Sequence, residues 1–567
     1  MVRSIRCGAC PHLFLFSCPF ETHGQKKIIS YNKDRASSRK GVIPLFGKDG
    51  LFMEQTTAKT PTFGQALFVL LVDAAIISYG VLDIHFESGA VFGLALSAHI
   101  PLFLAAVFTA IMGAIFVGKP WREVEEGMIN GITVALQAVL ILLAVGGLVG
   151  AWILSGVVPT LIFYGLNLLS PQYFLLAALL ICAIVSLSTG SSWSTSGTVG
   201  IALMGIGAGL GVPAPVTAGF VISGAYFGDK ISPLSDTTNL APAVAGSDLF
   251  SHIRAMLWTT GPTMIIVAAI AYYMGGGYAG GEMDASRISI IQQMMSAEFS
   301  ISIYGFLPPL LVLVLAAMKV PAIPGIVAGM LLASIMALFQ GIGIPDVMGA
   351  LYSGYSPSMI AEVAEAGDIS SVNELLKGAA VFSADAFESV KEVAGMLNGL
   401  LERGGLTGML ETVALILVAL VLGGIMETCG FLEVLLARLM QSVKSVFGLV
   451  ASVLVSCVFT NMFLGDQYLS LVMPGRMFKP AFGKFEQNGR KLDPRLLSRS
   501  LEDSGTLTSV LVPWNTCGAY NSSVLGVPTL SYLPYAFLNY LNPLVALLMT
   551  RLGIGIPWIE PGDKKAR

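Results

Sequence analysis

The sequence predicts an all-α polytopic membrane protein, and three observations indicate this fold class. Of the 567 residues, 54% are hydrophobic and only 12% are charged, whereas soluble globular proteins carry about 25% charged residues. Long apolar runs follow one another along the chain, and such runs span a bilayer as helices. Short polar clusters interrupt several runs, which predicts helices that break inside the membrane. We expect about ten transmembrane helices plus two re-entrant hairpins, in two inverted-topology repeats with discontinuous helices.

Ten segments are long and apolar enough to cross a bilayer as helices. They cover residues 64–83, 90–117, 132–154, 214–246, 250–275, 303–318, 322–341, 408–428, 498–530 and 532–552. Two further apolar stretches, 171–212 and 446–475, are each interrupted by a small polar tip. The tips lie at Thr189–Trp193 and at Thr460–Gln467, and we expect both stretches to be re-entrant hairpins.

The distribution of charged residues predicts which side of the membrane each loop lies on. Basic residues gather after the second span, in the loop 476–499 and in the carboxyl tail, whereas segment 346–405 is acidic. If the amino terminus is cytoplasmic, ten crossings place all three basic regions inside and the acidic segment outside, in agreement with the positive-inside rule. This agreement requires 446–475 to return to the side from which it came. Both termini are therefore expected in the cytoplasm.

An internal repeat relates the two halves of the chain. Each half runs from a span through a short amphipathic stretch and a hairpin to a broken helix and a final span. Inverted repeats with paired discontinuous helices are typical of secondary transporters, whose site lies near the bilayer midplane. The corresponding positions are Gly146-Gly147 with Gly423-Gly424, Thr189 with Thr460, Pro233 with Pro513, and Pro262 with Pro543.

These patterns divide the chain into seven segments. They are a basic irregular N-terminal extension (1–52), two N-terminal spans (53–125), a first transporter repeat (126–278), connecting spans (279–345), an acidic extracytoplasmic amphipathic insertion (346–405), a second transporter repeat (406–552) and a cytoplasmic tail (553–567). The extension lacks a long apolar run, and a short polar lead follows Met53 before the first span. We therefore expect translation to start at Met53 rather than a signal peptide to be cleaved.

Composition excludes several kinds of site. Cys7, Cys10, His12 and Cys18 lie close together in the extension, but the second pair of ligands of a zinc site is missing. The net charge of −3 gives no electrostatic case for binding nucleic acid. The spans contain no HExxH motif, no GxSxG with a suitable histidine and no paired metal motif, so an intramembrane enzyme is not expected. No cofactor is expected either.

Polar residues concentrate in Phe227–Ala243, FGDKISPLSDTTNLAPA, between two apolar segments. Asp229 and Asp236 flank the helix-breaking Pro233, and an ionised carboxylate in hydrocarbon costs a few kcal/mol. We interpret the stretch as a helix unwound in mid-bilayer, where carbonyls, carboxylates and hydroxyls form a site for a hard cation. The alternative is an extramembrane loop between two spans.

A second break follows the same plan, because Glu502 and Asp503 precede Pro513 in SRSLEDSGTLTSVLVPWNTCGAYNSS. Hard oxygen ligands of this kind suit Na⁺. The predicted Na⁺ ligands are the four carboxylates of Asp229, Asp236, Asp466 and Glu502. The wider set of ion-binding or coupling residues adds Thr189, Ser191, Ser192, Ser232, Ser235, Thr237, Thr238, Asn239, Thr460, Asn461, Asp503, Asn515 and Thr516.

One carboxylate is enough to couple Na⁺ to H⁺. Burial raises the pKa of a carboxyl group and a bound cation lowers it, so the same group can hold H⁺ and Na⁺ in turn. Asp236 is the first candidate, followed by Asp229 and Asp466. Lys230 is expected to pair with Asp229 and fix the loop, unless it snorkels toward water.

Two polar residues in the early spans are ambiguous. Asp73 lies in the middle of the first span, where a proton relay and a helix-packing hydrogen bond are both consistent with the sequence. His99, near Pro101, is expected to be a packing residue of a kinked helix.

Four stretches resemble the NhaC-type Na⁺/H⁺ antiporters of the ion-transporter superfamily: GAYFGDKISPLSDTTNLAPA, TGSSWSTSGTVGIALMGIG, TNMFLGDQYLSLVMPGRMF and LSRSLEDSGTLTSVLVPWNTCGAYNSSVLGV. The resemblance covers roughly 64–552. It implies a bacterial inner-membrane exchanger that takes in H⁺ and expels Na⁺. It also implies that the tips Thr189–Trp193 and Thr460–Asn461 meet the broken helices at Asp229–Asn239 and Glu502–Thr516.

Two functions remain open from the sequence. The first is Na⁺/H⁺ antiport by alternating access. The second is a Na⁺/H⁺-coupled organic acid exchanger of the malate/lactate type, since the family also contains such members. An organic anion would need an arginine or helix amino termini, and we expect no buried arginine in the site regions. The expected partners are Na⁺, H⁺ and membrane lipid, with a homodimer suggested by analogy to the superfamily.

Overall fold

The computed structural model describes most of the chain between residues 59 and 559. The described residues are 59–81, 84–85, 91–94, 96–278, 285–376, 378, 380–441, 443 and 445–559. The N-terminal extension, the expected start at Met53 and the cysteines of the extension lie outside this part, so those expectations stay predictions.

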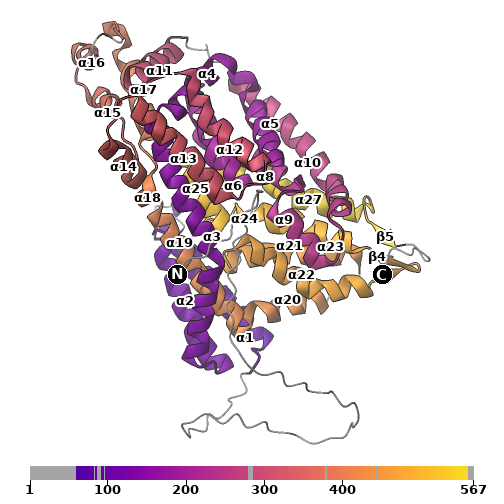
Figure 1. The fold of residues 1–567 in the computed structure, drawn as a ribbon. Coiled ribbons are helices and arrows are strands. Elements are labelled where there is room, and N and C mark those ends of the chain that lie inside the picture. The colour runs from indigo at the N-terminus through magenta and orange to yellow at the C-terminus, as the bar shows by residue number, and fades with distance from the viewer. Residues whose placement is uncertain are drawn as a thin grey trace, which may run out of the picture. The chain divides into compact units, whose positions relative to one another are not determined.

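Within the unit Thr57–Arg567, the described residues form an all-α fold, as predicted (Figure 1). Strands among them are two or three residues long and pair in antiparallel fashion, β1 with β2 and β4 with both β3 and β5. The strand bounds are Ile84–His85 (β1), Val91–Phe92 (β2), Glu486–Gln487 (β3), Arg490–Leu492 (β4) and Trp558–Ile559 (β5).

Eight helices in the described part are long and apolar enough to cross a membrane, or up to ten if each of two bent pairs forms one span. The eight are α1 (Phe63–Val81), α2 with η1 (His99–Val117), α3 (Trp121–Leu154), α5 (Pro171–Thr189), α10 (Leu249–Tyr278), α13 (Ala322–Phe339), α18 with α19 (Gly405–Cys429) and α21 (Val446–Phe463). The bent pairs are Ser286–Glu298 with Ile303–Ala317, at 92°, and Thr529–Tyr535 with Phe537–Arg551, at 54°.

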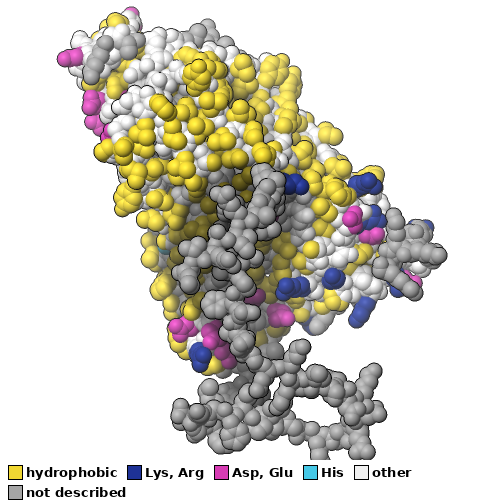
Figure 2. Space-filling view, in the orientation of Figure 1, with side chains coloured by type: hydrophobic (Ala, Val, Ile, Leu, Met, Phe, Trp, Pro, Cys, Tyr) yellow, Lys and Arg dark blue, Asp and Glu magenta, His cyan; other side chains and the backbone are white. Residues whose placement is uncertain are grey.

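The surface of these helices is suited to lipid. Large apolar side chains such as Leu71, Ile115, Tyr273 and Phe339 are exposed on them, and hydrophobic side chains cover broad areas of the face drawn in Figure 2. Soluble monomers rarely expose contiguous apolar areas of this kind. The chain is therefore a multi-pass membrane protein.

Both predicted helix breaks are present. In the first half, α8 (Ala214–Ile231) ends before Pro233 and α9 (Asp236–Ala245) begins after it, with Ser235 capping the amide of Thr238. In the second half, Asn515 caps the new helix after Pro513 by accepting a hydrogen bond from Cys517. Proline has no amide hydrogen, and a side-chain cap then starts the next helix. The second-half elements are α23 (Pro494–Leu501), the π-helix η5 (Glu502–Thr506), α24 (Leu507–Ser509) and α25 (Thr516–Leu525).

Each predicted hairpin has its turn at the expected polar tip. The first turn lies at Gly190, whose φ is +71°, and the second at Gly465, whose φ is +65°. After the turns, Ser191 and Asp466 cap the helices that follow. Because α5 and α21 are by themselves long enough to span, the assignment of re-entrant hairpins stays a prediction, as does the inverted repeat. The remaining hairpin elements are α6 (Ser192–Thr195), η2 (Ser196–Gly200), α7 (Ile201–Gly209) and α22 (Gln467–Lys484).

Three predicted boundaries are wrong. The apolar stretch 446–475 was expected to end at residue 475, but α22 continues to Lys484. The second span was expected from residue 90, but helix α2 begins at His99, after the strand pair β1–β2. The third was expected from residue 132, but α3 begins at Trp121. Its polar first turns contain no helix breaker. Two i,i+4 ion pairs, Lys119–Glu123 at 2.6 Å and Arg122–Glu126 at 3.2 Å, support the start of the helix.

The segment predicted as an amphipathic insertion consists of short helices. Tyr355 and Arg403 close it through an antiparallel bridge, and the Glu298 carboxylate accepts hydrogen bonds from the Tyr355 hydroxyl and the Ile360 amide. Its location outside the membrane stays a prediction. Its elements are α14 (Ile344–Ser353), α15 (Ser358–Glu365), α16 (Ile369–Leu375), η4 (Ala384–Ala386) and α17 (Phe387–Leu401). The other helices are α4 (Val157–Leu168), α11 (Ala285–Glu298), η3 (Ile303–Phe306), α12 (Leu307–Ala317), α20 (Phe431–Gln441), α26 (Thr529–Tyr532), η6 (Leu533–Tyr535) and α27 (Phe537–Arg551).

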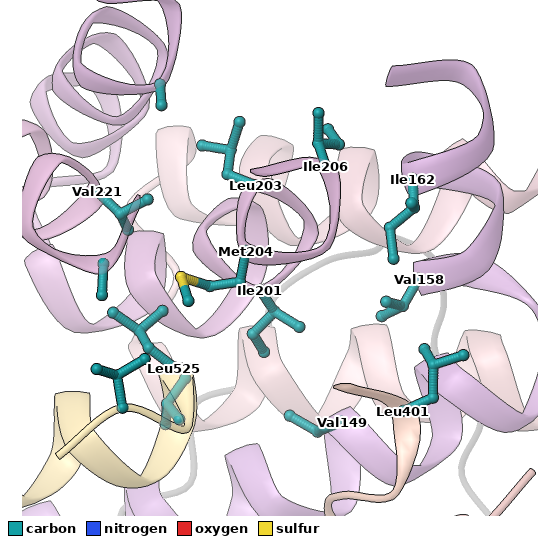
Figure 3. Close-up of a cluster of buried hydrophobic side chains, with 14 of the residues drawn as sticks. Val149, Val158, Ile162, Ile201, Leu203, Met204, Ile206, Val221, Leu401 and Leu525 are labelled. Carbon is teal, nitrogen blue, oxygen red and sulfur yellow. The ribbon is translucent and has the colours of Figure 1, made fainter. Parts of the chain in front are cut away.

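Apolar packing and glycine contacts position the halves around the site. Close helix approach joins α3 to α19, because a Cβ atom on Gly127 would lie 2.9 Å from the Gly424 carbonyl oxygen and one on Gly131 would lie 3.2 Å from the Gly424 Cα. Around α7, the second arm of the first hairpin, a buried apolar cluster draws on both halves and on the insertion (Figure 3). Its labelled members are Val149, Val158, Ile162, Ile201, Leu203, Met204, Ile206, Val221, Leu401 and Leu525.

Candidate functional site

A cavity of about 660 Å³ lies where the hairpin turns meet the first helix break and the start of α25. Three carboxylates line it, Asp229 from α8, Asp236 from α9 and Asp466 from the cap of α22. These are the three residues that the sequence predicts as coupling carboxylates. Hydroxyl-bearing residues surround them, namely Thr189, Ser191, Ser192, Ser194, Ser235, Thr237 and Thr516.

Asp229 joins the first hairpin to the first broken helix. Its Oδ2 accepts hydrogen bonds from the Ser192 hydroxyl at 2.6 Å and from the Ser192 amide at 3.2 Å. Gly190 sits against the same break, because a Cβ atom there would lie 2.6 Å from the Leu234 carbonyl carbon. The expected meeting of the tip Thr189–Trp193 with the broken helix is thereby confirmed.

Asp236 and Asp466 both stand at the start of a helix, where amide dipoles favour negative charge. Asp236 is the first residue of α9 and its side chain is exposed. Within the described part of the chain, its carboxylate makes no ion pair. Asp466 is buried, and its Oδ1 accepts a hydrogen bond from the Leu469 amide at 3.0 Å. The two carboxylates therefore differ in how freely they can take up a cation.

Three polar residues of the first break do not line the cavity, although the sequence placed them in the ion-binding set. The Ser232 hydroxyl donates to the Leu187 carbonyl, the Thr238 hydroxyl to the Lys230 carbonyl, and the Asn239 amide to the Ser235 carbonyl. The donor–acceptor distances are 2.7, 2.9 and 2.7 Å. The Lys230 carbonyl lies in the last turn of α8 and the Leu187 carbonyl in the last turn of α5, where helices leave carbonyls without an intrahelical partner, whereas Asn239 bonds within the first turn of α9.

Five predicted residues of the second half likewise lie outside the cavity lining, namely Thr460, Asn461, Glu502, Asp503 and Asn515. Asn461 donates to the Gly505 carbonyl at 2.8 Å, and Asn515 donates to the Asn461 side chain at 3.1 Å. These bonds confirm that the second hairpin meets the second broken helix. Thr460 instead bonds within its own helix, to the Ser456 carbonyl.

The expected partner of Lys230 is wrong. Lys230 pairs with Asp503, with Nζ and Oδ1 2.5 Å apart and both side chains fully buried. Successive residues on a helix point in different directions, so Asp229 faces the cavity while Lys230 faces the second half of the chain. Snorkelling is excluded by the same burial. Asp503, expected in the ion-binding set, also accepts hydrogen bonds from Thr259 and Asn542, each at 2.8 Å.

Glu502 lies outside the cavity lining, although the sequence predicts it as a Na⁺ ligand. It is fully buried in the π-helix η5, and neither carboxyl oxygen makes a hydrogen bond, although the Thr506 hydroxyl is in the same turn. Arg499 is also fully buried, with Nε 3.7 Å from Asp503 and Nη1 2.7 Å from the Gly555 carbonyl. The expectation of no buried arginine near the second break is therefore wrong, and the i,i+4 spacing to Asp503 was the signal.

Aromatic packing connects the first hairpin to the second half. The Trp193 and Tyr520 rings stack with centroids 4.2 Å apart, and the Tyr520 hydroxyl donates to the Trp193 carbonyl at 2.8 Å. Trp193 lines the cavity, as do Gln467 and Tyr468, which the sequence analysis did not single out as ion-binding residues. Sequence periodicity could not have found these contacts, because their partners lie far apart in the chain.

The early polar residues make hydrogen bonds between helices. The Thr109 hydroxyl donates to the Asp73 carboxylate at 2.7 Å, which fits the helix-packing alternative. His99 lies 2.9 Å from the Glu411 carbonyl through Nε2. Neither residue lines the cavity.

The three cavity carboxylates do not converge on one point. Among the described residues, no group of three His, Cys, Asp or Glu side chains could hold a metal ion together. A cation in the cavity would therefore combine one or two carboxylates with hydroxyl and carbonyl oxygens, which suits a weakly held monovalent ion.

Known proteins resemble this chain over most of its length. A profile described as the Na⁺/H⁺ antiporter family matches residues 224–386 and 380–554. The Na⁺/H⁺ antiporter NhaC of Alkalihalophilus pseudofirmus is 38% identical over 88% of this chain and 97% of its own. The malate-2H⁺/Na⁺-lactate antiporter of Bacillus subtilis is 37% identical over 81% of this chain and 90% of its own.

Among solved structures, the efflux pump MtrF of Neisseria gonorrhoeae aligns with 89% of this chain and 97% of its own. The TM-score is 0.33 and the sequence identity is 13%.

Proposed function

The chain belongs to the Na⁺/H⁺ antiporter family, and from this premise we propose that it expels Na⁺ in exchange for H⁺. The observation that carries the proposal is the cavity in which Asp229, Asp236 and Asp466 meet hydroxyl oxygens at two hairpin turns and a helix break. Carboxylate, hydroxyl and carbonyl oxygens are the ligands that hard cations prefer. The same carboxylates are groups that protons can neutralise.

The mechanism we propose is alternating access with a shared carboxylate. A carboxylate that faces the cavity and has no ion-pair partner can be neutralised either by Na⁺ or by H⁺. The two ions then compete for one group, and the release of one accompanies the uptake of the other. Asp236 is the first candidate because its exposed carboxylate has no ion-pair partner in the described part of the chain. Asp229 and Asp466 hold part of their oxygen atoms in hydrogen bonds.

The cellular setting is part of the proposal. We place the protein in a bacterial inner membrane with both termini cytoplasmic, because this orientation puts the basic loops inside. A homodimer is the oligomer suggested by analogy.

The test is Na⁺-induced dequenching of a pH-sensitive dye in everted vesicles that contain the protein. Na⁺ alone should dissipate the imposed pH gradient. Asp236→Asn should abolish this response while the protein remains in the membrane, whereas Asp385→Asn, on the exposed surface of the insertion, should respond like the wild type. Full activity of Asp236→Asn would remove Asp236 from the coupling role.

A second candidate function is exchange of organic acids coupled to Na⁺ or H⁺. The cavity volume supports this candidate, because the cavity has room for a small organic acid. Its volume of about 660 Å³ is many times the roughly 30 Å³ that one water molecule occupies in the liquid. The same assay separates the two candidates when it is repeated with malate or lactate. A response that requires the organic acid would support the second candidate.

A further inference from the structure

One cationic side chain stands among the carboxylates of the cavity. Lys319 is the only lysine or arginine among the described residues that line it, together with Asp229, Asp236 and Asp466. It belongs to the turn between α12 and α13, outside both predicted repeats. Its position in the sequence carries no functional signal, because a lysine at the end of an apolar span is common at a membrane surface.

The backbone at Lys319 is strained. Its φ is +64°, a left-handed conformation that glycine adopts freely and other L-residues rarely do. Within the described residues, only Asn488 is another non-glycine residue with positive φ. Strain of this kind persists mostly at functional sites.

The ammonium group of Lys319 has no fixed partner. The side chain is exposed, and within the described part of the chain no carboxylate lies within ion-pair distance. A lysine is a compact charge on a flexible four-carbon stem, so it can approach the carboxylates without being bound to one of them. Lys230, in contrast, is buried in its ion pair with Asp503 and does not line the cavity.

We propose that Lys319 is a tethered counter-cation that sets the charge of the cavity and thereby its preference for monovalent over divalent ions. Three ionised carboxylates around one cavity make its electrostatic potential negative, which favours a divalent over a monovalent cation even when only one or two of them contact the ion. One ammonium group offsets one of those charges. This inference rests on the proposed Na⁺/H⁺ exchange and adds a residue that determines the specificity of the same cavity.

The electrostatic effect scales with the charge of the ion. A unit charge about 10 Å from a bound monovalent ion, at an effective dielectric constant of about 30, changes the affinity of the cavity for that ion by roughly sixfold. The interaction energy doubles for a divalent ion, so its affinity changes by the square of that factor, or roughly 40-fold. A structural defect would not produce this quadratic relation.

The experiment is a charge series at position 319 in the everted-vesicle assay. For Lys319→Gln we expect the half-saturating Na⁺ concentration to fall about sixfold and, when measured at Na⁺ well below half-saturation, the half-inhibitory Ca²⁺ concentration to fall about 40-fold. Lys319→Arg should match the wild type, and Lys319→Glu should shift both values further in the same direction. Lys484→Gln, an exposed lysine outside the cavity lining, is the matched control and should shift neither.

A glycine variant separates charge from backbone strain. Lys319→Gly relieves the strained φ and removes the charge, so it should reproduce the ion dependence of Lys319→Gln even if its stability rises. If neither neutral variant changes Na⁺ saturation or Ca²⁺ inhibition while the wild type exchanges Na⁺ for H⁺, the counter-cation role is refuted. If the wild type itself shows no response to Na⁺, the proposed function fails instead.

Discussion

The buried ion pair between Lys230 and Asp503 offers the sharpest prediction about stability. Each side chain is fully buried, and the pair links α8 in the first half to η5 in the second. Replacing one member leaves the other as a charge without its main partner, which costs about 3–5 kcal/mol in buried pairs. The neighbours of the pair decide which replacement costs more.

Asp503 has further partners and Lys230 has none besides Asp503 among the described side chains. In Lys230→Met, the remaining carboxylate keeps the hydrogen bonds from Thr259 and Asn542 and the nearby Arg499, so we expect a loss of about 3 kcal/mol. In Asp503→Asn, two buried cations, Lys230 and Arg499, lose their counter-ion together. We expect that loss to be about 5 kcal/mol.

The double variant Lys230→Met with Asp503→Asn should be more stable than Asp503→Asn alone, because only Arg499 then remains unpaired. The measurement is the midpoint of thermal unfolding in detergent, followed by size-exclusion chromatography of each variant at equal heating rates. Lys484→Met, an exposed lysine, is the control and should unfold like the wild type. If Lys230→Met unfolds at a lower temperature than Asp503→Asn, or if both match the wild type, the reasoning is refuted.

Three further variants test the cavity and its surroundings. Asp229→Asn should raise the half-saturating Na⁺ concentration in vesicles. Glu502→Gln should leave this concentration unchanged, because Glu502 lies outside the cavity lining. If both variants raised it equally, Glu502 would have to be counted among the Na⁺ ligands. Gly190→Ala should destabilise by about 1–2 kcal/mol and lower the exchange rate, since φ is +71° and the new Cβ would meet the backbone of the first break; wild-type melting and exchange would contradict this. Asp73→Asn should exchange normally, because an amide oxygen still accepts the hydrogen bond from Thr109, and a loss of exchange with retained folding would restore the proton-relay role.

Local signals predicted the parts of the fold that depend on neighbouring residues. Pro233 and Pro513 interrupt apolar runs next to capping residues, and both helices break there. Thr189 and Thr460 marked polar tips, and the chain turns shortly after each of them, at Gly190 and Gly465. These features follow from backbone chemistry that the sequence displays directly.

Contacts between distant segments could not be predicted in the same way. Adjacency suggested that Lys230 pairs with Asp229, but the two side chains point in different directions and the partner lies in the other half of the chain. The strained backbone of Lys319 likewise leaves no trace in composition. Which of the predicted ion-binding residues reach the cavity depends on how the helix break orients each hydroxyl. Thr237 lines the cavity, whereas the neighbouring Thr238 does not.

Two neighbouring residues at the end of α8 therefore contact different parts of the protein. Asp229 lines the cavity, and Lys230 ties the same helical turn to η5. Breaking a buried pair costs several kcal/mol, so we expect α8 and η5 to move together when access to the cavity alternates. If the two elements move together, the intact pair does not oppose the transition between the two access states. The double variant Lys230→Met with Asp503→Asn should then exchange Na⁺ for H⁺ at a rate per folded molecule within about threefold of the wild type. A rate tenfold or more above the wild type would mean that the pair must open in every cycle, and that the two elements separate.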